Sequence, residues 1–248
     1  MKGIILAAGK GERMESETED KPKCLIQYKG KAIIDYILET LYECGINDII
    51  IVTGYKSEIL ESYLKDRDIQ FIKNKHFDIT NMVKTLFCAE SEMNDNIIVS
   101  YSDIIFKKRV LLSLMNNKEN FVVTIDKKWR NLWDLRMDDP LQDAETLKID
   151  DGYISEIGEK PLSYDDIEGQ YIGLFKISDI ILDRVKIFYH NLDKSTSYDG
   201  NNFNNMFMTS FLQLIIDHLM PIKADLIEGG WLEFDTKLDL ASYNSYSL

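Results

Sequence analysis

The sequence predicts an α/β fold built on a doubly wound, mostly parallel sheet, and three observations carry this prediction. Apolar runs of strand length recur at residues 2–8, 47–54, 96–103 and 120–126. Within these runs the apolar residues are continuous rather than alternating, as in strands covered on both faces. Segments with helical spacing of apolar residues separate them. Strands that alternate with helices in this way are typical of parallel sheets.

The first half of the chain alternates strands and helices. After the strand at 2–8, apolar residues such as Ile33, Ile37 and Leu41 predict a helix at 33–44, and Gly45 follows it where a C-terminal glycine is favoured. The other elements expected in this half are strands at 47–54, 69–73, 96–103 and 120–126 and helices at 57–65, 82–91 and 108–116. Ligands bind beyond the carboxyl ends of such strands, so the residues that follow 2–8 and 96–103 become site candidates.

The second half is richer in short strands. Two runs, 145–149 and 153–157, flank Asp150-Asp151-Gly152 and predict a hairpin. Thr236 and Asp239 form a capping signature for a closing helix. We expect one domain, 1–248, with an embedded β-rich subdomain at roughly 126–177. The elements expected after the hairpin are strands at 170–177, 222–228 and 231–235 and helices at 179–189, 205–219 and 236–246.

Composition excludes several classes of function. The net charge is −13, and the chain lacks the basic excess that phosphate-backbone binding needs, so we expect no nucleic-acid partner. No apolar stretch approaches the roughly 20 residues of a membrane helix. The cysteines, Cys24, Cys44 and Cys88, are few and widely spaced, which favours a reducing cytoplasm. A phosphate site in so acidic a chain would depend on a few local cations and a metal ion.

A glycine pair with two cations follows the first strand, in the stretch "LAAGKGERM" at 6–14. A dinucleotide fingerprint would need a third small residue where Met14 stands, and the P-loop pattern is absent. A solvent-exposed turn between strand and helix is the simpler alternative. Glycines at this place also let a backbone wrap a phosphate closely.

Three ordered segments, "LAAGKGERM", "PKCL" at 22–25 and "GKAII" at 30–34, together resemble the signature of the nucleotidyltransferase superfamily that includes sugar-1-phosphate nucleotidylyltransferases. The resemblance implies a Rossmann-like fold and a catalytic pair, Arg13 and Lys23. A forked guanidinium suits phosphate oxygens, and a lysine suits the α-phosphate as its charge shifts. The nucleotide-binding residues that it implies are Leu6, Ala7, Ala8, Gly9, Lys10 and Gly11.

Two aspartates are candidate metal ligands. Asp103 ends the strand 96–103, directly after Ser102, which we assign to the nucleotide site. Asp235 lies in "WLEFDT", which resembles the late metal-binding segment of the family. The alternatives are a loop-opening role for Asp103 and a helix-capping role for Asp235. The resemblance implies that both bind Mg²⁺, because two carboxylates with substrate phosphates form the usual site for this ion.

The segment "DITNMVKTLFCA" at 78–89 resembles phosphocholine- and phosphonate-type cytidylyltransferases. In that resemblance Thr80 and Asn81 contact the pyrimidine ring, and an asparagine amide can read a base edge because it both donates and accepts. Asn81 can equally cap the helix at 82–91, and both roles can hold together.

Later segments extend the resemblance to an acceptor site. Lys160 is a candidate catalytic clamp on the incoming phosphate, and Glu168, Gln170 and Tyr171 are candidate acceptor-binding residues. Trp129, with Trp133, could form an aromatic wall for a cationic group, although core packing is the favoured role for both.

Taken together, the resemblance implies a cytoplasmic, Mg²⁺-dependent cytidylyltransferase of capsule biosynthesis. It would transfer CMP from CTP to a small phosphorylated acceptor, with L-glutamine phosphate preferred. Phosphocholine, aminoethylphosphonate and sugar 1-phosphates are alternative acceptors, and a non-catalytic nucleotide-binding domain is the alternative class. We expect no membrane partner and leave a homodimer open.

Overall fold

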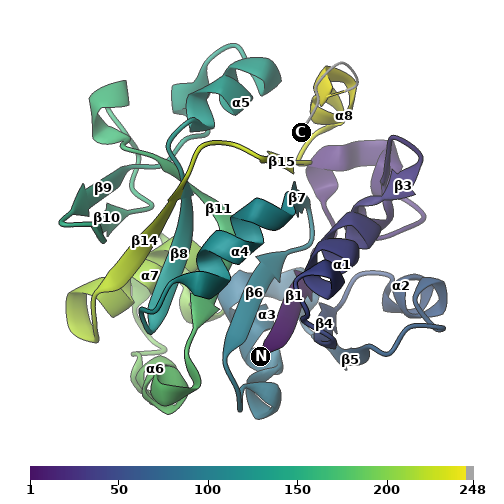
Figure 1. Ribbon diagram of the computed structural model, residues 1–248, viewed down its shortest axis with the longest axis horizontal. Coiled ribbons are helices and arrows are strands. Elements are labelled where there is room, and N and C mark those ends of the chain that lie inside the picture. The colour runs from purple at the N-terminus through teal and green to yellow at the C-terminus, as the bar shows by residue number, and fades with distance from the viewer. Residues whose placement is uncertain (244–248) are drawn as a thin grey trace.

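The computed structural model describes residues 1–243 and is built around one central sheet of nine strands (Figure 1). In spatial order these strands are β5 (Gln70–Lys73), β4 (Asp48–Thr53), β1 (Lys2–Ala7), β6 (Ile97–Tyr101), β11 (Gln170–Ile177), β8 (Phe121–Asp126), β14 (Ile222–Ile227), β10 (Tyr153–Ile157) and β9 (Leu147–Asp150).

The sheet is mixed, and one reversed strand lies at its centre. Strands β5, β4, β1 and β6 are parallel, and β8 is parallel to β14. Strand β11 is antiparallel to both of its neighbours, β6 and β8, so these two run in the same direction. The carboxyl ends of β1, β6 and β8 therefore meet at one edge of the sheet, where the amino end of β11 also lies. The predicted α/β fold class is confirmed.

Helices cover both faces of the sheet, as the doubly wound prediction requires. The helices are α1 (Ile33–Glu43), α2 (Ser57–Tyr63), α3 (Met82–Cys88), α4 (Lys108–Asn116), α5 (Trp129–Arg136), α6 (Asp179–Asn191), α7 (Met208–His218) and α8 (Lys237–Ser242). Helices α1 and α4 pack on one face, whereas α3 and α7 pack on the other (Figure 1).

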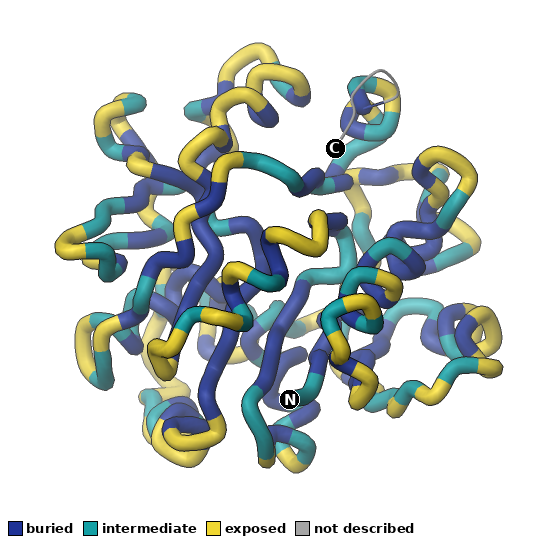
Figure 2. Tube along the Cα trace, viewed as in Figure 1, coloured by how far each residue is buried: buried dark blue, intermediate teal, exposed yellow. Residues whose placement is uncertain are grey.

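Each face of the sheet has its own apolar core. Along β1, Ile5 and Ala7 belong to the core beneath α1 and α4, while Ile4 and Leu6 belong to the core beneath α3, α6 and α7. Figure 2 shows the central strands as the most deeply buried part of the molecule. Because side chains of a strand alternate between its faces, a strand buried on both sides reads as a continuous apolar run.

Three short strand pairs complete the fold. Strand β7 (Ile104–Phe106) pairs with β15 (Trp231–Glu233), β2 (Gln27–Tyr28) pairs with β3 (Lys31–Ala32), and β12 (Ser197–Tyr198) pairs with β13 (Asn201–Asn202). The pairing of β7 with β15 carries the C-terminal segment back to the end of β6. The predicted closing helix begins after Thr236, whose capping box with Asp239 is present, and its predicted part beyond residue 243 lies outside the described residues.

The region predicted as a β-rich subdomain, 126–177, is distributed over the central sheet. Its hairpin β9–β10 turns at Asp151 and Gly152, as expected, and extends the sheet at one end. Strand β11, however, lies in the middle of the sheet, and 129–136 forms the unpredicted helix α5. Local patterns could not place β11, because its neighbours are distant in sequence. The subdomain boundary itself stays a prediction.

Residues 1–243 contain no helix that is both long and apolar enough to cross a membrane. Cys24, Cys44 and Cys88 are all free thiols, and Cys24 is buried.

Candidate active site

The turn after β1 forms the floor of a pocket. Leu6 pairs with Tyr101, so the carboxyl ends of β1 and β6 lie side by side. Gly11 has a left-handed φ of 65°, and a β-carbon there would come within 3.0 Å of the Lys23 side chain. A β-carbon on Gly9 would meet no atom of the chain within 4 Å, so packing does not require glycine there. The bare backbone of Gly9 is open to close approach by a ligand.

The pocket has a volume of about 370 Å³ and opens at the carboxyl ends of β1 and β6. Most of the predicted nucleotide-binding residues line it, together with two predicted catalytic residues and both predicted metal ligands. These are Leu6, Ala8, Gly9, Gly11, Thr80, Asn81 and Ser102, then Arg13 and Lys23, and Asp103 and Asp235. Ala7 is instead buried within β1, and the exposed Lys10 side chain lies 3.0 Å from the Glu12 carboxylate.

Lys23 joins the two predicted metal ligands. It lies in a short 3-10 turn after Pro22, and it is buried, with 8% of its surface exposed. Its ammonium is 2.7 Å from Asp103 Oδ2 and 2.9 Å from Asp235 Oδ1. Burial lowers the pKa of Lys23, but the two carboxylates outweigh burial and raise it to about 12. The ammonium therefore stays charged at neutral pH.

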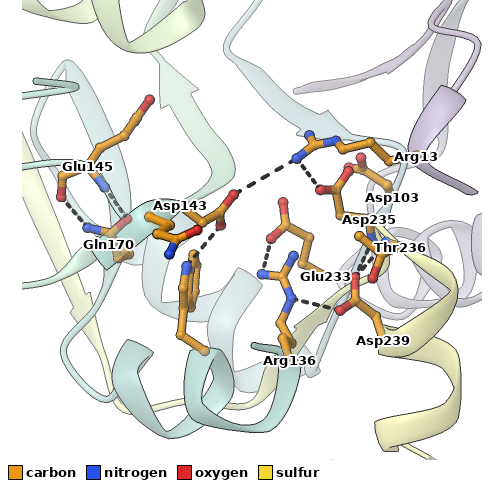
Figure 3. Close-up of polar contacts among 12 residues, drawn as sticks. Arg13, Asp103, Arg136, Asp143, Glu145, Gln170, Glu233, Asp235, Thr236 and Asp239 are labelled. Atoms are coloured by element: carbon orange, nitrogen blue, oxygen red, sulfur yellow. Dashed lines mark hydrogen bonds and ion pairs between the residues drawn. The ribbon is translucent and has the colours of Figure 1, made fainter. Parts of the chain in front are cut away.

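Arg13 reaches the same cluster from the solvent side. Its guanidinium is 2.6 Å from Asp235 Oδ2 and 3.9 Å from Asp143 Oδ1 (Figure 3). The side chain is 67% exposed, so it is free to turn toward a phosphate in the pocket. Asp235 thus contacts two of the three predicted catalytic cations, Arg13 and Lys23.

The Asp103–Asp235 pair fits a divalent cation. Both carboxylates converge on one ammonium, which shows that they can share a single cation. Asp103 Oδ1 is buried and has no hydrogen-bond partner, so one ligand atom is unused. Residues 1–243 contain no cluster of three or more His, Cys, Asp or Glu side chains arranged to hold a metal. A metal ion held here would need further oxygen ligands from substrate and water.

Asn81 caps α3 in the structure, as one of its two alternatives predicted, and its contact with the base stays a prediction. Asn81 Oδ1 accepts a hydrogen bond from the Met82 backbone N–H at 2.8 Å and so caps α3. Its amide nitrogen makes only a long contact, 3.4 Å, with the Asn205 carbonyl. Thr80 donates to the His76 carbonyl at 2.8 Å. Both residues line the pocket while also fixing the backbone at the start of α3.

The predicted acceptor residues do not line this pocket. Lys160 donates to the Leu141 and Gln142 carbonyls at 2.6 and 2.7 Å, and Glu168 accepts from the Ile149 N–H at 3.1 Å. Gln170 accepts from the Glu145 N–H at 3.1 Å and donates to the Glu145 carbonyl. These side chains hold backbone in place, so the contacts supply a structural role for each, and their role in binding stays a prediction.

The predicted aromatic residues pack against protein. Trp129 and Trp133 are both buried, with their rings edge to face at 5.6 Å. The Tyr171 ring packs edge to face against Tyr101 at 5.7 Å, and Tyr101 lines the pocket. Tyr171 therefore supports the pocket wall from behind. Both tryptophans thus have the core-packing role that was favoured over an aromatic wall.

Sequence analysis missed several charged residues beside the site (Figure 3). Glu233 contacts Arg136, and burial together with the charges of Asp103 and Asp235 raises the pKa of Glu233 while Arg136 lowers it. Glu233 could have been found, because Glu233 and Asp235 are two apart in the predicted strand 231–235 and would share a face of it. No local signal pointed to Arg136, whose partners lie about 100 positions away.

Glu145 is a further acidic group in this region. Burial raises its pKa to about 7, the Thr209 hydroxyl lowers it through a 3.4 Å hydrogen bond, and nearby carboxylates such as Asp143 raise it. The pocket itself is lined by three carboxylates, Glu12, Asp103 and Asp235, but only two cations, Arg13 and Lys23. The site as it stands is net negative, so a polyphosphate would need additional positive charge.

A glycine turn at the end of a parallel strand, beside a lysine shared by two aspartates, is the arrangement expected of a nucleotidyltransferase. Residues 3–154 match the MobA-like NTP transferase domain, and the chain belongs to that family.

Relatives with known names agree with this class. The chain is 47% identical to the CTP:phosphoglutamine cytidylyltransferase of Campylobacter jejuni, over 97% of this chain and 98% of the relative. It is 28% identical to the choline-phosphate cytidylyltransferase of Streptococcus pneumoniae, over 80% of this chain and 92% of the relative.

A solved structure shows the same fold across nearly the whole molecule. The CTP:phosphocholine cytidylyltransferase of Streptococcus pneumoniae superposes with a TM-score of 0.75 at 22% identity, over 97% of this chain and 96% of that one.

Proposed function

We propose that the protein is a Mg²⁺-dependent cytidylyltransferase that transfers CMP from CTP to L-glutamine phosphate, giving CDP-L-glutamine and pyrophosphate. The observation that carries the reaction is the pocket at the ends of β1 and β6, where Lys23 lies between Asp103 and Asp235. The choice of substrates rests on the similarity to the Campylobacter jejuni enzyme along nearly the whole chain.

The chain's own residues account for nucleotide binding in this proposal. The backbone from Ala8 to Gly11 cradles the phosphates, with Gly9 allowing the closest approach. Arg13 leaves Asp235 and forms a forked contact to phosphate oxygens. Lys23 turns from the aspartates to the α-phosphate, where its charge stabilises the transition state. Thr80, Asn81 and Ser102, which also line the pocket, contact the base and ribose in this proposal.

Asp103 and Asp235 would hold the Mg²⁺ ion. The unused Asp103 Oδ1 and the net negative pocket support this assignment, because the residues present cannot neutralise a triphosphate alone. When bound, the ion would supply positive charge to the phosphates and leave the cations of the chain free to act on the α-phosphate. The proposal needs no protein nucleophile, because positioning and charge stabilisation suffice for phosphoryl transfer.

Group transfer then follows an in-line path. An oxygen of the acceptor phosphate forms a bond to the α-phosphorus of CTP, and the bond from that phosphorus to the bridging oxygen of pyrophosphate breaks. The electron pair leaves with pyrophosphate. Arg13 and Lys23 approach from separate elements, so they can hold the two phosphate groups in register.

Phosphocholine is the second acceptor candidate, favoured by similarity to the Streptococcus pneumoniae enzyme. A choline cation is bound by open aromatic faces. Trp129 and Trp133 are buried against each other, and Trp133 also packs against Trp231, so these rings offer no such wall. This packing supports an acceptor other than a quaternary amine.

The test is a pyrophosphate-release screen of CTP and UTP against L-glutamine phosphate, phosphocholine, aminoethylphosphonate and a sugar 1-phosphate, with Mg²⁺ or with EDTA. We expect CTP with L-glutamine phosphate to give the highest kcat/KM and EDTA to abolish turnover. Asp103→Asn should lower kcat at least about tenfold, which is roughly 1.4 kcal/mol in the barrier. Turnover of another acceptor at a higher kcat/KM, or undiminished turnover in EDTA, would contradict the proposal.

A further inference from the structure

Arg136, at the end of α5, is almost completely enclosed, with 1% of its side chain exposed. Its Nε donates to Asp239 Oδ1 at 3.1 Å, and one terminal nitrogen donates to Glu233 Oε2 at 2.5 Å (Figure 3). Burial lowers the pKa of Arg136, and the charges of Glu233 and Asp239 raise it above its ordinary value. The guanidinium is therefore a permanent charge held between two carboxylates.

Asp239 transmits this contact to the site. Its other oxygen, Oδ2, accepts the backbone N–H of Asp235 at 2.7 Å and the backbone N–H of Thr236 at 2.8 Å. One carboxylate thus binds Arg136 with one oxygen and the backbone of Asp235 with the other. The orientation of Asp235 depends on where Arg136 holds Asp239.

We propose that Arg136 is a positioning residue of the active site, which fixes the Asp235 carboxylate through Asp239 and holds Glu233 directly. This inference rests on the proposed function in one respect, that Asp235 takes part in cation binding and transfer. Arg136 does not line the pocket, so it acts through these acids and not on the substrate.

The arrangement explains why an arginine is required. Glu233, Asp235 and Asp239 follow one another within seven residues and are crowded against one another. Removing one partner of a buried charge pair leaves an uncompensated charge that must move or become hydrated. A guanidinium offers separate N–H groups in a fixed plane, here Nε to Asp239 and a terminal nitrogen to Glu233, whereas a lysine ammonium is a point charge with no fixed fork.

A purely structural role is the alternative, because α5 packs against α8 and Arg136 could serve only to dock the two helices. The two roles differ in what they change. Docking affects the free energy of unfolding, while positioning affects cation binding and kcat at temperatures where the variant is fully folded.

The experiment compares Arg136→Met with Arg136→Lys, and uses Arg130→Met as the matched control on the same helix. Arg130 is 54% exposed, with a long ion pair of 3.8 Å to Asp134 and its guanidinium over the Tyr164 ring. Two kinds of measurement are made below the melting temperature of each variant. The first is kcat and KM with the nucleotide and acceptor that the wild type uses, and the second is Mn²⁺ binding with a CTP analogue that cannot be cleaved.

We expect Arg136→Met to lower kcat at least about 30-fold, with the KM for the nucleotide changed less than about threefold. We expect Mn²⁺ binding to weaken at least about tenfold. Arg136→Lys should recover part of both losses, and Arg130→Met should match the wild type. If Arg136→Met does not fold, Asp239→Asn tests the same path and should weaken Mn²⁺ binding in the same direction.

Unchanged Mn²⁺ binding and kcat in folded Arg136→Met, with only a lower melting temperature, would overturn the inference. Failure of the proposed function is a separate result, namely a wild type that turns over none of the substrates tested. In that case Mn²⁺ binding still decides the role of Arg136, because it is measured without turnover.

Discussion

The two halves of the candidate site use charged and polar side chains in different ways. In the nucleotide half, Lys23 pairs with Asp103, 80 positions away, and with Asp235, 212 positions away. In the segment from 139 to 170, Lys160, Glu168 and Gln170 bind backbone groups only 18 to 25 positions away. The first set joins distant elements at a pocket, whereas the second fixes its own loop.

This difference indicates which predicted site residues can exchange their partners for a substrate. A side chain whose partners are other charged side chains can exchange them for a substrate at modest cost, because the charges re-pair. A side chain that holds backbone groups gives up those hydrogen bonds when it moves, and where the groups are shielded from water, as at Gln170, it leaves them stranded. The nucleotide half is therefore built to change partners, and the second half is built to stay as it is.

The largest expected effect is that of Lys23→Met. Removing the ammonium leaves Asp103 and Asp235 facing each other and takes away the cation for the α-phosphate, so kcat should fall at least about 100-fold. Steady-state pyrophosphate release measures the loss, and the exposed Lys118→Met serves as control. A decrease in kcat of less than tenfold would mean that Lys23 is not catalytic, and the two halves would then not differ as described.

The next effect concerns stability and pH at Glu145, whose folded pKa of about 7 exceeds the ordinary value of 4.5. The unfolded chain loses this proton first, so ionisation opposes folding increasingly from about pH 4.5 to pH 7. The stability of Glu145→Gln relative to the wild type, as the difference in free energy of unfolding, should therefore rise by on the order of 1–3 kcal/mol from pH 5 to pH 8. Urea unfolding at pH 5 and pH 8 measures the free energy of unfolding of both proteins, with the exposed Glu228→Gln as control. If the difference between variant and wild type were the same at both pH values, Glu145 would have an ordinary pKa.

Gln170→Ala tests whether the second half is structural. The change strands the N–H and carbonyl of Glu145, so the free energy of unfolding should fall by about 1–3 kcal/mol while the relative kcat/KM values of the acceptors stay unchanged. The control Gln142→Ala, on the exposed surface, should lower the free energy of unfolding much less. The opposite pattern, altered acceptor preference at unchanged stability, would support the acceptor-binding role of Gln170 that the sequence resemblance implied.

Lys160→Met should give the smallest effect. Its ammonium contacts two carbonyls at an exposed position, so the loss of stability should be less than about 1 kcal/mol. We expect kcat/KM within about threefold of the wild type. A fall of more than tenfold in kcat would mean that Lys160 leaves the Leu141 and Gln142 carbonyls to contact the incoming phosphate, and that the second half also exchanges partners.

The sequence predicted the parallel strands and most helices, because strands buried on both faces and amphipathic helices leave clear patterns. It also identified the residues around β1 and β6, since a glycine turn and strand-end aspartates have a local signature. It missed α5 and the central place of β11, because strand order depends on contacts between remote segments. It missed Arg136 for the same reason. The resemblance assigned binding roles to Lys160, Glu168 and Gln170 and gave no sign of the backbone contacts that these side chains make, and those roles stay predictions.

The pairing of β7 with β15 has a consequence for folding during synthesis. It delivers Asp235 to the site from near the end of the chain, long after Lys23 and Asp103 have been synthesised. A nascent chain that has emerged only as far as β14 can fold most of its sheet, yet it has Lys23 with a single aspartate. Because this long-range contact forms late, the proposed roles of Asp103 and Asp235 predict that chains lacking β15 bind no metal–nucleotide complex and show no activity until that segment docks.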